Sequence, residues 1–313
     1  MTNTLQTTAT TALQQQNGAD MNALYSSFIG YLDAAPKTVE TYRKALKQFF
    51  NFLQERGINF PQRADVLAYK EELQGAGYKP TTIQNYITAV KVFFNWTSQE
   101  GVYPNIAEHV KGAKLDHEFK KDYFSNEQIS DMQHSIKTDD LQGLRDYALF
   151  KVMSSLGLRD IEACRLNVED LRMRGGNTVL FLQRKGHEEK TAYPIGPDAA
   201  EAIRDYLKER GAYTDGDPLF ISLSNHANGG RLTTRSISRA IKNIILANGY
   251  DSSRLTSHSL RHSAATNALK AGIPLPEVQR FMGHVSPATT DIYNHAIQLE
   301  ENTCAKTLET LYK

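Results

Sequence analysis

The sequence predicts a mainly α-helical protein with a small antiparallel sheet, divided into two domains. A chain of 313 residues is long enough for about two domains. Apolar residues recur at steps of three and four along most of it, which is typical of amphipathic helices. Two short segments, 178–183 and 190–195, are instead rich in β-formers, with a glycine-containing turn between them. We therefore expect one β-hairpin in an otherwise helical fold.

Residues 21–111 form the first predicted domain, which is entirely helical. We expect four helices, of which the second and fourth begin at Pro36 and Pro80, and glycines follow the last three. Thr38 is a candidate N-cap for the second helix. The polar faces carry these basic and hydroxyl side chains: Arg43, Lys44, Lys47, Lys79, Thr82 and Lys91. Taken alone, such residues are typical of a solvated helix face.

The second predicted domain covers residues 123–313. It follows a polar, aperiodic stretch at 112–122, interpreted as a linker, and opens with a capping box at Ser125–Gln128. Residues 1–20 lack both basic residues and an apolar core, which predicts a disordered leader rather than a signal peptide. Further expected elements are helices at 144–156, 197–209 and 231–247 (the last capped by Thr233 or Thr234), a buried strand at 218–222 and an amphipathic C-terminal tail at 296–313.

Composition describes an ordinary globular protein. Charged residues make up 23% of the chain and apolar residues 40%, while the formal net charge is only +1. Any basic surface for nucleic acid must therefore be local. Cys164 and Cys304 fit no metal-ligand spacing and favour a reducing compartment. Since no apolar run is long enough to span a bilayer, we expect a cytoplasmic protein.

Residues 256–295 hold four side chains that can serve phosphate chemistry. His258 and Arg261 are three residues apart and would share one face of a helix. His284 follows a helix stop at Gly283, and Tyr293 lies nine residues further on.

Three boxes in this stretch carry a resemblance to a known family. They are His258-Ser259-Leu260-Arg261-His262, Met282-Gly283-His284 and Thr289-Thr290-Asp291-Ile292-Tyr293-Asn294-His295. They resemble the H-x-x-R-H, L-G-H and T-T-x-x-Y-x-H boxes of the tyrosine recombinase (phage integrase) family, with Met282 in place of the usual Leu. Arg159, which follows Gly157 closely and precedes Glu162 by three, resembles the first box of that family. Several boxes in the right order are more specific than one motif.

The resemblance implies six catalytic residues: Arg159, Lys185, His258, Arg261, His284 and the nucleophile Tyr293. Lys185 beside Gly186 matches the family lysine best, but the loop is one residue longer than usual and lacks a trailing arginine, so Lys190 is an alternative. Residues 21–111 would be a helical, SAM-like core-binding domain that forms a DNA clamp with the catalytic domain. The DNA contacts would be the six residues of its polar faces together with Arg235, Arg239 and Lys242.

Phosphodiester transfer needs residues of these kinds. Two guanidinium groups can clamp the non-bridging oxygens of a phosphate, and either histidine of the phosphate-binding set can accept the phenol proton. A lysine whose pKa is lowered by neighbouring cations can protonate the leaving 5′-oxygen. A 3′-phosphotyrosine intermediate conserves the bond energy, so the resemblance implies no ATP, metal or other cofactor.

The implied partners are double-stranded DNA with an inverted-repeat core site and further copies of the chain. As in the simple recombinases of the Xer, Cre and integron kind, two protomers would bind each site. Two sites would synapse as a tetramer and exchange strands through a Holliday junction, in the cytoplasm and associated with the nucleoid. The amphipathic tail would dock on a neighbouring protomer, with packing on its own domain as the alternative. Integration, excision, inversion and dimer resolution are all open, as are the target sequence and any accessory factor.

Parts of this pattern would also fit three other functions. His258 and His262, at i and i+4, could be metal ligands, but Ser259 stands where a His-Glu-x-x-His hydrolase has glutamate, and Arg261 would repel a cation. A type IB topoisomerase would use the same chemistry to relax DNA. A DNA-binding protein without catalysis is disfavoured because all the boxes are present.

Overall fold

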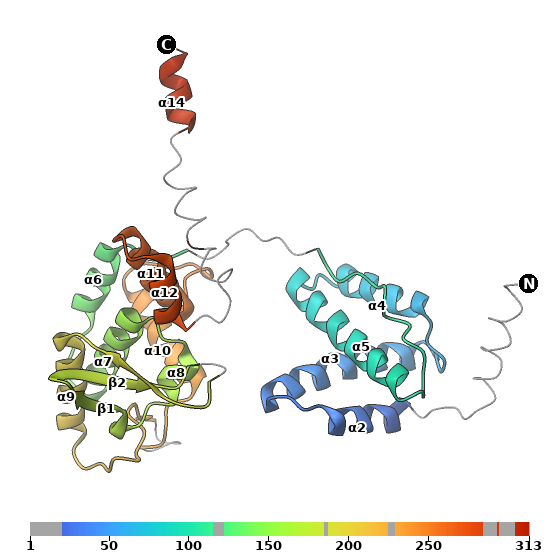
Figure 1. The fold of residues 1–313 in the computed structure, drawn as a ribbon, viewed down its shortest axis with the longest axis horizontal. Helices are drawn as coiled ribbons and strands as arrows, with labels where there is room; N and C mark the ends of the chain where they lie inside the picture. The colour runs from blue at the N-terminus through green and yellow to red at the C-terminus, as the bar shows by residue number, and fades with distance from the viewer. Residues whose placement is uncertain are drawn as a thin grey trace, which may run out of the picture. The chain divides into compact units, whose positions relative to one another are not determined.

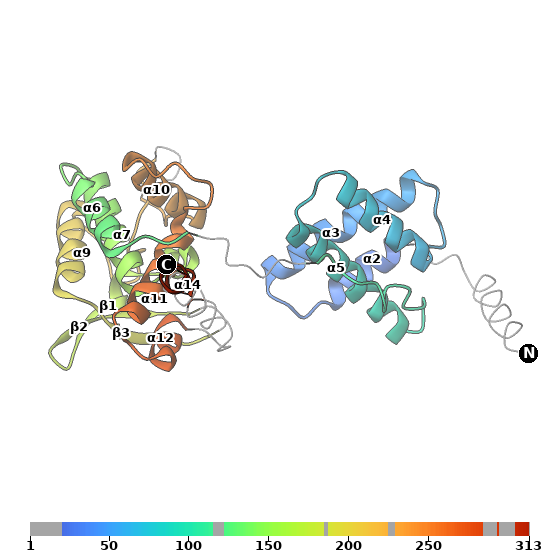
Figure 2. The ribbon, with the colours of Figure 1, turned by 90° about the horizontal axis from the view of Figure 1, so that it is seen from above.

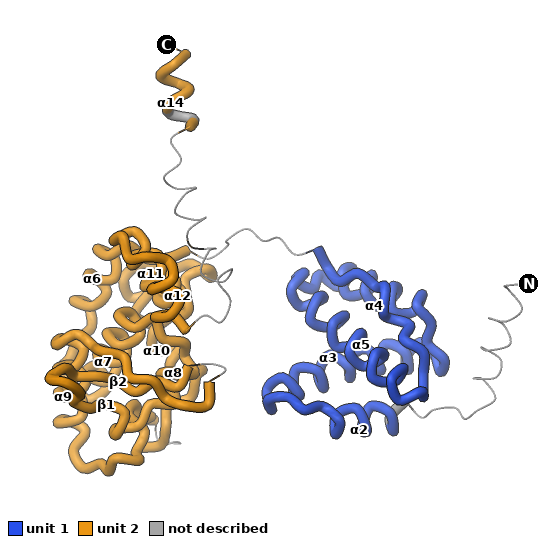
Figure 3. The backbone as a smooth tube through the Cα atoms, in the orientation of Figure 1, with its two compact units in different colours: residues 1–117 blue, residues 118–313 orange. Residues whose placement is uncertain are grey.

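The computed structural model describes residues 21–114, 122–184, 187–224, 229–283, 293 and 304–312. The chain divides into two compact units, residues 1–117 and residues 118–313 (Figure 3).

The first unit is a helical bundle, as the sequence predicts (Figure 1). Two of the four helices among its described residues begin with proline, whose missing N–H and fixed φ suit the first turn. Thr38 is not a cap, because α3 already starts at Pro36 with Ala35 as N-cap. The helices are α2 (Met21–Tyr31), α3 (Pro36–Glu55), α4 (Arg63–Gly75) and α5 (Pro80–Gln99).

Aromatic side chains form the core of this bundle. The ring of Phe49 on α3 lies 5.1 Å from that of Tyr69 on α4 and 6.0 Å from that of Phe94 on α5. Phe28 of α2 meets Phe93 of α5 edge to face at 5.4 Å. Each fully buried phenylalanine contributes about 1.5–3 kcal/mol. These contacts hold the four helices in fixed relation, which also fixes where their basic side chains point.

The second unit combines helices with one small sheet (Figures 1 and 2). The strands pair in the order β1-β2-β3, antiparallel throughout, with Leu180 opposite Leu171 on one side and Tyr193 on the other. Its elements are α6 (Asn126–Ser135), α7 (Leu141–Leu156), α8 (Asp160–Cys164), the 3-10 helix η1 (Val168–Asp170), β1 (Leu171–Arg174), β2 (Asn177–Leu182), β3 (Thr191–Pro194), α9 (Pro197–Arg210), α10 (Thr234–Ala247), α11 (Ser257–Lys270), α12 (Leu275–Met282) and α14 (Cys304–Leu311).

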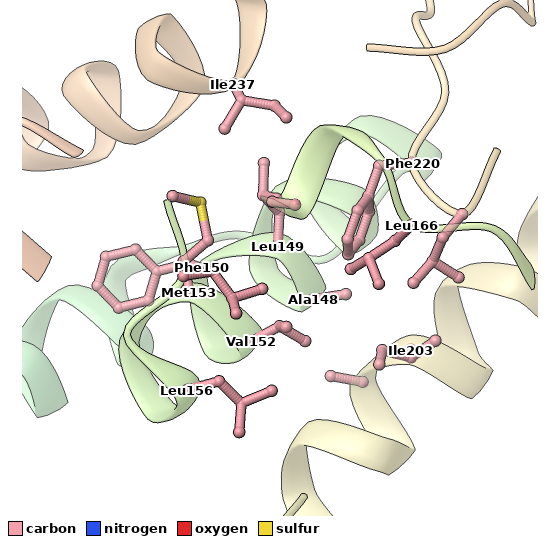
Figure 4. Close-up of a cluster of buried hydrophobic side chains, with 14 of the residues drawn as sticks. Ala148, Leu149, Phe150, Val152, Met153, Leu156, Leu166, Ile203, Phe220 and Ile237 are labelled. Carbon is pink, nitrogen blue, oxygen red and sulfur yellow. The ribbon is translucent and has the colours of Figure 1, made fainter. Parts of the chain in front are cut away.

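Helix α7 is the centre of the second unit. It lies between α9 and α11 (Figure 2), and its apolar residues face several directions because it is covered on several sides. Figure 4 shows its Leu149 and Val152 in one cluster with Ile203 of α9, with Ile237 of α10 and with Phe220, which lies between those two helices in the sequence. The C-terminus of this buried helix therefore leads into a well-fixed turn at Gly157.

Most of the predicted elements of this unit are present, with two corrections. The capping box at Ser125 and Gln128 is confirmed, and Thr233 is the cap of α10. Residues 218–222 are not a strand: Pro218 and Ile221 make only isolated bridges, although the segment is buried. The sheet has a third strand, β1, that the sequence does not reveal, because three of its four residues are exposed and two are arginines.

None of the helices in the described ranges is long and apolar enough to cross a membrane.

Candidate active site

Gly157 builds the turn on which the site is assembled. It caps α7 with a positive φ of 56°, a conformation that glycine adopts without strain. A Cβ at this position would lie 2.9 Å from the sulfur of Met282, so the side chain of this α12 residue packs against the bare backbone of Gly157. The turn places Arg159 at the N-cap of α8, two residues beyond the glycine.

Glu162 is the buried carboxylate at the centre of the site. Its Oε1 accepts a hydrogen bond from Arg159 Nη1 at 2.6 Å, and its Oε2 accepts from the Arg159 backbone N–H at 3.0 Å and from Arg184 Nη1 at 2.8 Å. Arg261 Nη1 lies 3.9 Å from Oε2. Burial opposes ionisation of Glu162, but the Arg159 N–H and the charges of Arg184 and Arg159 outweigh it and lower the pKa. One negative charge thus faces three guanidinium groups.

Arg261 is held by the backbone. The residue is 1% exposed, and its guanidinium donates to the carbonyls of Gly157 at 2.6 Å and of Met282 at 2.5 Å. Burial and the charge of Arg159 lower its pKa to about 10, which leaves it charged at neutral pH. Arg261 therefore joins α11 to the ends of α7 and α12 as well as bringing positive charge to the site.

Tyr293 lies against the helix that carries Arg261. The residue is 3% exposed and packs with Ala265 of α11 and with Val278 and Met282 of α12. Its hydroxyl is 2.9 Å from Nδ1 of His262. Burial raises the pKa of Tyr293, against the opposing charges of Arg261 and Arg159. The structure thus brings together Arg159, Arg261 and Tyr293, which come from three separate sequence boxes.

Of the predicted catalytic histidines and lysines, the structure describes His258 and Lys190. The ring of His258 meets that of His262 edge to face at 4.6 Å. Lys185 and His284 lie outside the described residues. Lys190 donates to both carboxylate oxygens of the buried Asp170, at 2.7 and 2.8 Å. Its ammonium group therefore anchors the start of β3 to η1.

Arg184 is the main residue of the site that sequence reasoning missed. It is 3% exposed, stacks on the ring of Tyr193 at 4.5 Å and donates to Glu162 and to the carbonyls of Leu156 and Phe281. It thereby ties the end of β2 to α7, α8 and α12. Its only sequence signal is a charged residue directly after a buried apolar strand, which is a weak one because strand ends usually reach solvent.

The residues predicted to contact DNA differ in exposure and in the partners of their side chains within the chain. Arg43, Lys47, Lys79, Arg235 and Arg239 are exposed, and Thr82 is half-buried. The other three cations have partners within the chain: Lys44 pairs with Glu40 at 2.9 Å, Lys91 donates to the Val110 carbonyl, and Lys242 donates to the carbonyls of Ser252 and Leu255.

No group of three or more potential metal ligands gathers within the residues that the structure describes.

Comparison with known proteins places the chain in a family. The family described as "Phage integrase family" matches residues 122–300, more than half of the chain. A second description, "Phage integrase, N-terminal SAM-like domain", matches residues 27–101. The chain belongs to the phage integrase family. The helical first unit agrees with the SAM-like domain, and the second unit, which combines helices with a sheet, agrees with the integrase domain.

The relatives named here are tyrosine recombinases. The chain is 35% identical over 156 residues to tyrosine recombinase XerC of Pelobacter propionicus, an alignment that covers 49% of this chain and 48% of the relative. It thus spans about half the length of the curated relatives that it matches at this level. It is 26% identical over 306 residues to tyrosine recombinase XerD of Listeria innocua, covering 89% of this chain and 96% of that one.

Solved structures share the fold. The recombinase XerH bound to a palindromic difH substrate, in a post-cleavage complex, has a TM-score of 0.73 at 21% identity, covering 87% of this chain and 80% of that one. A lambda integrase dimer bound to a core site has a TM-score of 0.65 at 16% identity, covering 87% of this chain and 76% of that one.

Proposed function

We propose that this phage integrase family member is a site-specific DNA recombinase that cuts and rejoins DNA through a 3′-phosphotyrosine intermediate. The observation that carries the proposal is that Arg159 and Arg261 gather around the buried Glu162 and that the charges of both guanidinium groups act on the phenol of Tyr293. A tyrosine held beside an excess of positive charge is suited to attack a phosphodiester.

In the proposed reaction, Arg159 and Arg261 bind the scissile phosphate. Guanidinium groups stay charged and planar, so they can neutralise the charge that gathers on the non-bridging oxygens in the transition state. Arg159 reaches the surface, with a side chain 22% exposed, whereas Arg261 is buried and held by two backbone carbonyls. His258 and His284 add hydrogen bonds to the same oxygens.

Covalent attachment then breaks the strand. The Tyr293 oxygen forms a bond to phosphorus as the bond to the 5′-oxygen breaks, and Lys185 gives that oxygen its proton. The phosphotyrosine keeps the energy of the broken bond, so a 5′-hydroxyl from another strand can reverse the step. Positioning and electrostatic stabilisation are the main sources of catalysis in such a scheme.

The proposed substrate is double-stranded DNA with an inverted repeat, bound by two protomers and synapsed as a tetramer that passes through a Holliday junction. Similar proteins have been solved with a palindromic substrate and as a dimer on a core site, which supports this for the present chain. The exposed Arg43, Lys47 and Lys79 of the first unit and Arg235 and Arg239 of the second would contact phosphates. A DNA-bound enzyme of this kind would work in the cytoplasm, on the nucleoid.

A covalent trapping assay tests the proposal. Binding sites would first be selected from random DNA, and one would then be made with a nick near the cleavage point so that the cut strand is lost. Wild-type protein should give a covalent adduct on a denaturing gel. Tyr293→Phe removes one oxygen and should bind the site but give no adduct, while Tyr213→Phe, at an exposed tyrosine, should behave as wild type.

An adduct formed by Tyr293→Phe, or no adduct with wild type on any selected site, would contradict the proposal. Relaxation of plasmids that lack the selected site, at the rate seen with plasmids that contain it, would favour a topoisomerase instead.

A further inference from the structure

The phenol of Tyr293 has a specific polar partner, and it is not one of the residues assigned to the phosphate. The Tyr293 hydroxyl lies 2.9 Å from Nδ1 of His262, and the two ring centroids are 5.3 Å apart. Both residues are buried, Tyr293 at 3% and His262 at 8% exposure. A hydrogen bond in such a place is made with little competition from water and fixes both rings.

His262 is well placed relative to the rest of the site. It follows Arg261 directly on α11. The two hydrogen bonds that Arg261 donates to backbone carbonyls tie this helix to the ends of α7 and α12. The group that touches the nucleophile and the group that would bind the phosphate are therefore consecutive on one rigid element. His258, one turn earlier on the same helix, contacts the ring of His262 edge to face.

The direction of this hydrogen bond follows from the state of the two groups. Burial favours the protonated phenol, so in the imidazole tautomer that carries its proton on Nε2, Tyr293 donates and Nδ1 of His262 accepts. When the phenol oxygen becomes a phosphate ester it must lose that proton. An imidazole nitrogen at 2.9 Å needs no rearrangement to take it.

We propose that His262 is the general base for Tyr293: its Nδ1 accepts the phenol proton as the oxygen attacks phosphorus. In this step the O–H bond of Tyr293 breaks and an Nδ1–H bond forms on His262. At the same time the bond from the Tyr293 oxygen to phosphorus forms, and the bond from phosphorus to the 5′-oxygen breaks. On rejoining, Nδ1 returns the proton to the phenol. The inference rests on the proposed function and assigns a proton acceptor to its first step.

His262→Asn is the sharpest variant, because an asparagine Oδ1 can take the place of Nδ1 and accept the same hydrogen bond without basicity. Cleavage of the nicked substrate under single-turnover conditions should slow by about 100-fold or more, the usual contribution of a general base. DNA binding should be unchanged. His134→Asn, at an exposed histidine of α6, is the matched control and should cleave at the wild-type rate.

A second measurement separates proton transfer from a structural role. Replacing Tyr293 by a fluorinated tyrosine makes the phenol more acidic, so its proton needs less help to leave. In the His262→Asn background this replacement should recover most of the lost cleavage rate, while in the wild-type background it should change the rate only slightly. A residue that merely supports the fold would show no such selective recovery.

Two results would overturn the inference and leave the proposed function intact. One is an adduct formed by His262→Asn at the wild-type rate or faster, which would make the contact a resting position of the phenol. The other is slow cleavage that the fluorinated tyrosine does not restore. If His262→Asn fails to fold, His262→Ala, which leaves the phenol without the Nδ1 acceptor, is measured in the same way with the same criteria. Failure of the wild-type protein to form any adduct would instead sink the proposed function.

Discussion

Glu162 shows how a single residue can organise a cationic site. Three guanidinium groups around one carboxylate leave an excess of positive charge in a partly water-excluded place. Like charges so close together repel, and the bonds to Glu162 and to backbone carbonyls hold them there in the absence of DNA. A bound phosphate would balance this excess positive charge, so the arrangement favours the binding of a phosphate.

Arg184 should be a structural support of this arrangement. Replacing it by glutamine removes a buried partner of Glu162, and breaking one side of a buried ion pair typically costs about 3–5 kcal/mol. We expect the free energy of unfolding in denaturant to fall by that order. Arg174→Gln, at an exposed arginine of β1, is the control and should change it by less than about 0.5 kcal/mol. Equal effects of the two substitutions would refute the structural role.

A substrate with an altered leaving group should show which of the two candidate lysines is the general acid. Lys185→Ala should slow cleavage of ordinary DNA, and a substrate with sulfur at the 5′-bridging position should restore much of the rate, because its leaving group needs no proton. Lys190→Ala should give no such selective recovery, since the Lys190 ammonium is bound to Asp170. Recovery with the Lys190 variant alone would move the acid role there.

Sequence motifs located the residues but not their contacts. The boxes predicted that Arg159, Arg261 and Tyr293 belong to one site, and the fold brings them together. The sequence could not predict that Glu162 bridges Arg159 and Arg184, or that His262 rather than His258 meets the phenol. Such contacts join segments far apart in the chain, and their geometry depends on tertiary packing that residue spacing does not carry.

Among the elements, the turn between α7 and α8 matters most for the site. Gly157 and Gly175 have the same φ of 56°, but a Cβ at Gly157 would meet Met282 at 2.9 Å and one at Gly175 would meet nothing within 4 Å. The pair therefore separates backbone strain from packing.

Gly157→Ala should be more damaging than Gly175→Ala. Both substitutions introduce left-handed strain of about 1–2 kcal/mol. Only the first also crowds the buried side chain of Met282, which adds about 1–3 kcal/mol of overpacking next to the Gly157 and Met282 carbonyls that hold Arg261. Denaturant unfolding would measure both variants, and DNA cleavage should drop in the first alone. A similar loss of stability in both would show that the close approach of α12 is unimportant.

The sequence predicted helices better than strands. Helix starts at Pro36, Pro80 and Ser125 carry strong local signals and are found in the structure. The strand β1 could not be predicted, because an exposed edge strand needs no apolar alternation. Residues 218–222 mislead in the other direction: they are apolar because they are buried, and burial alone does not make a strand.

At the scale of the whole molecule, α14 presents an unusual surface. Its Leu308 and Leu311 are 45% and 72% exposed, and Tyr312 beyond it is 80% exposed. An amphipathic helix with exposed leucines is suited to dock in an apolar groove. We expect the partner to be a neighbouring protomer on the same DNA, where the effective concentration makes a weak contact count.

Removing the chain after His295 tests this expectation. The truncated protein should bind a single half-site as tightly as the full chain, but lose cooperative binding to the inverted repeat and lose recombination. Glu309→Gln, which changes a polar residue of α14, serves as the control and should bind cooperatively. Unchanged cooperativity after truncation, measured by gel shift, would show that the tail packs on its own protomer.

The central claim is that Tyr293 forms a covalent bond to DNA, and identifying the attached residue tests it most directly. The adduct trapped on the nicked substrate would be digested with protease and nuclease, and the nucleotidyl peptide sequenced by mass spectrometry. The account predicts a 3′-phosphate ester on Tyr293 and on no other residue. A nucleotide carried by a serine or by another tyrosine would contradict it.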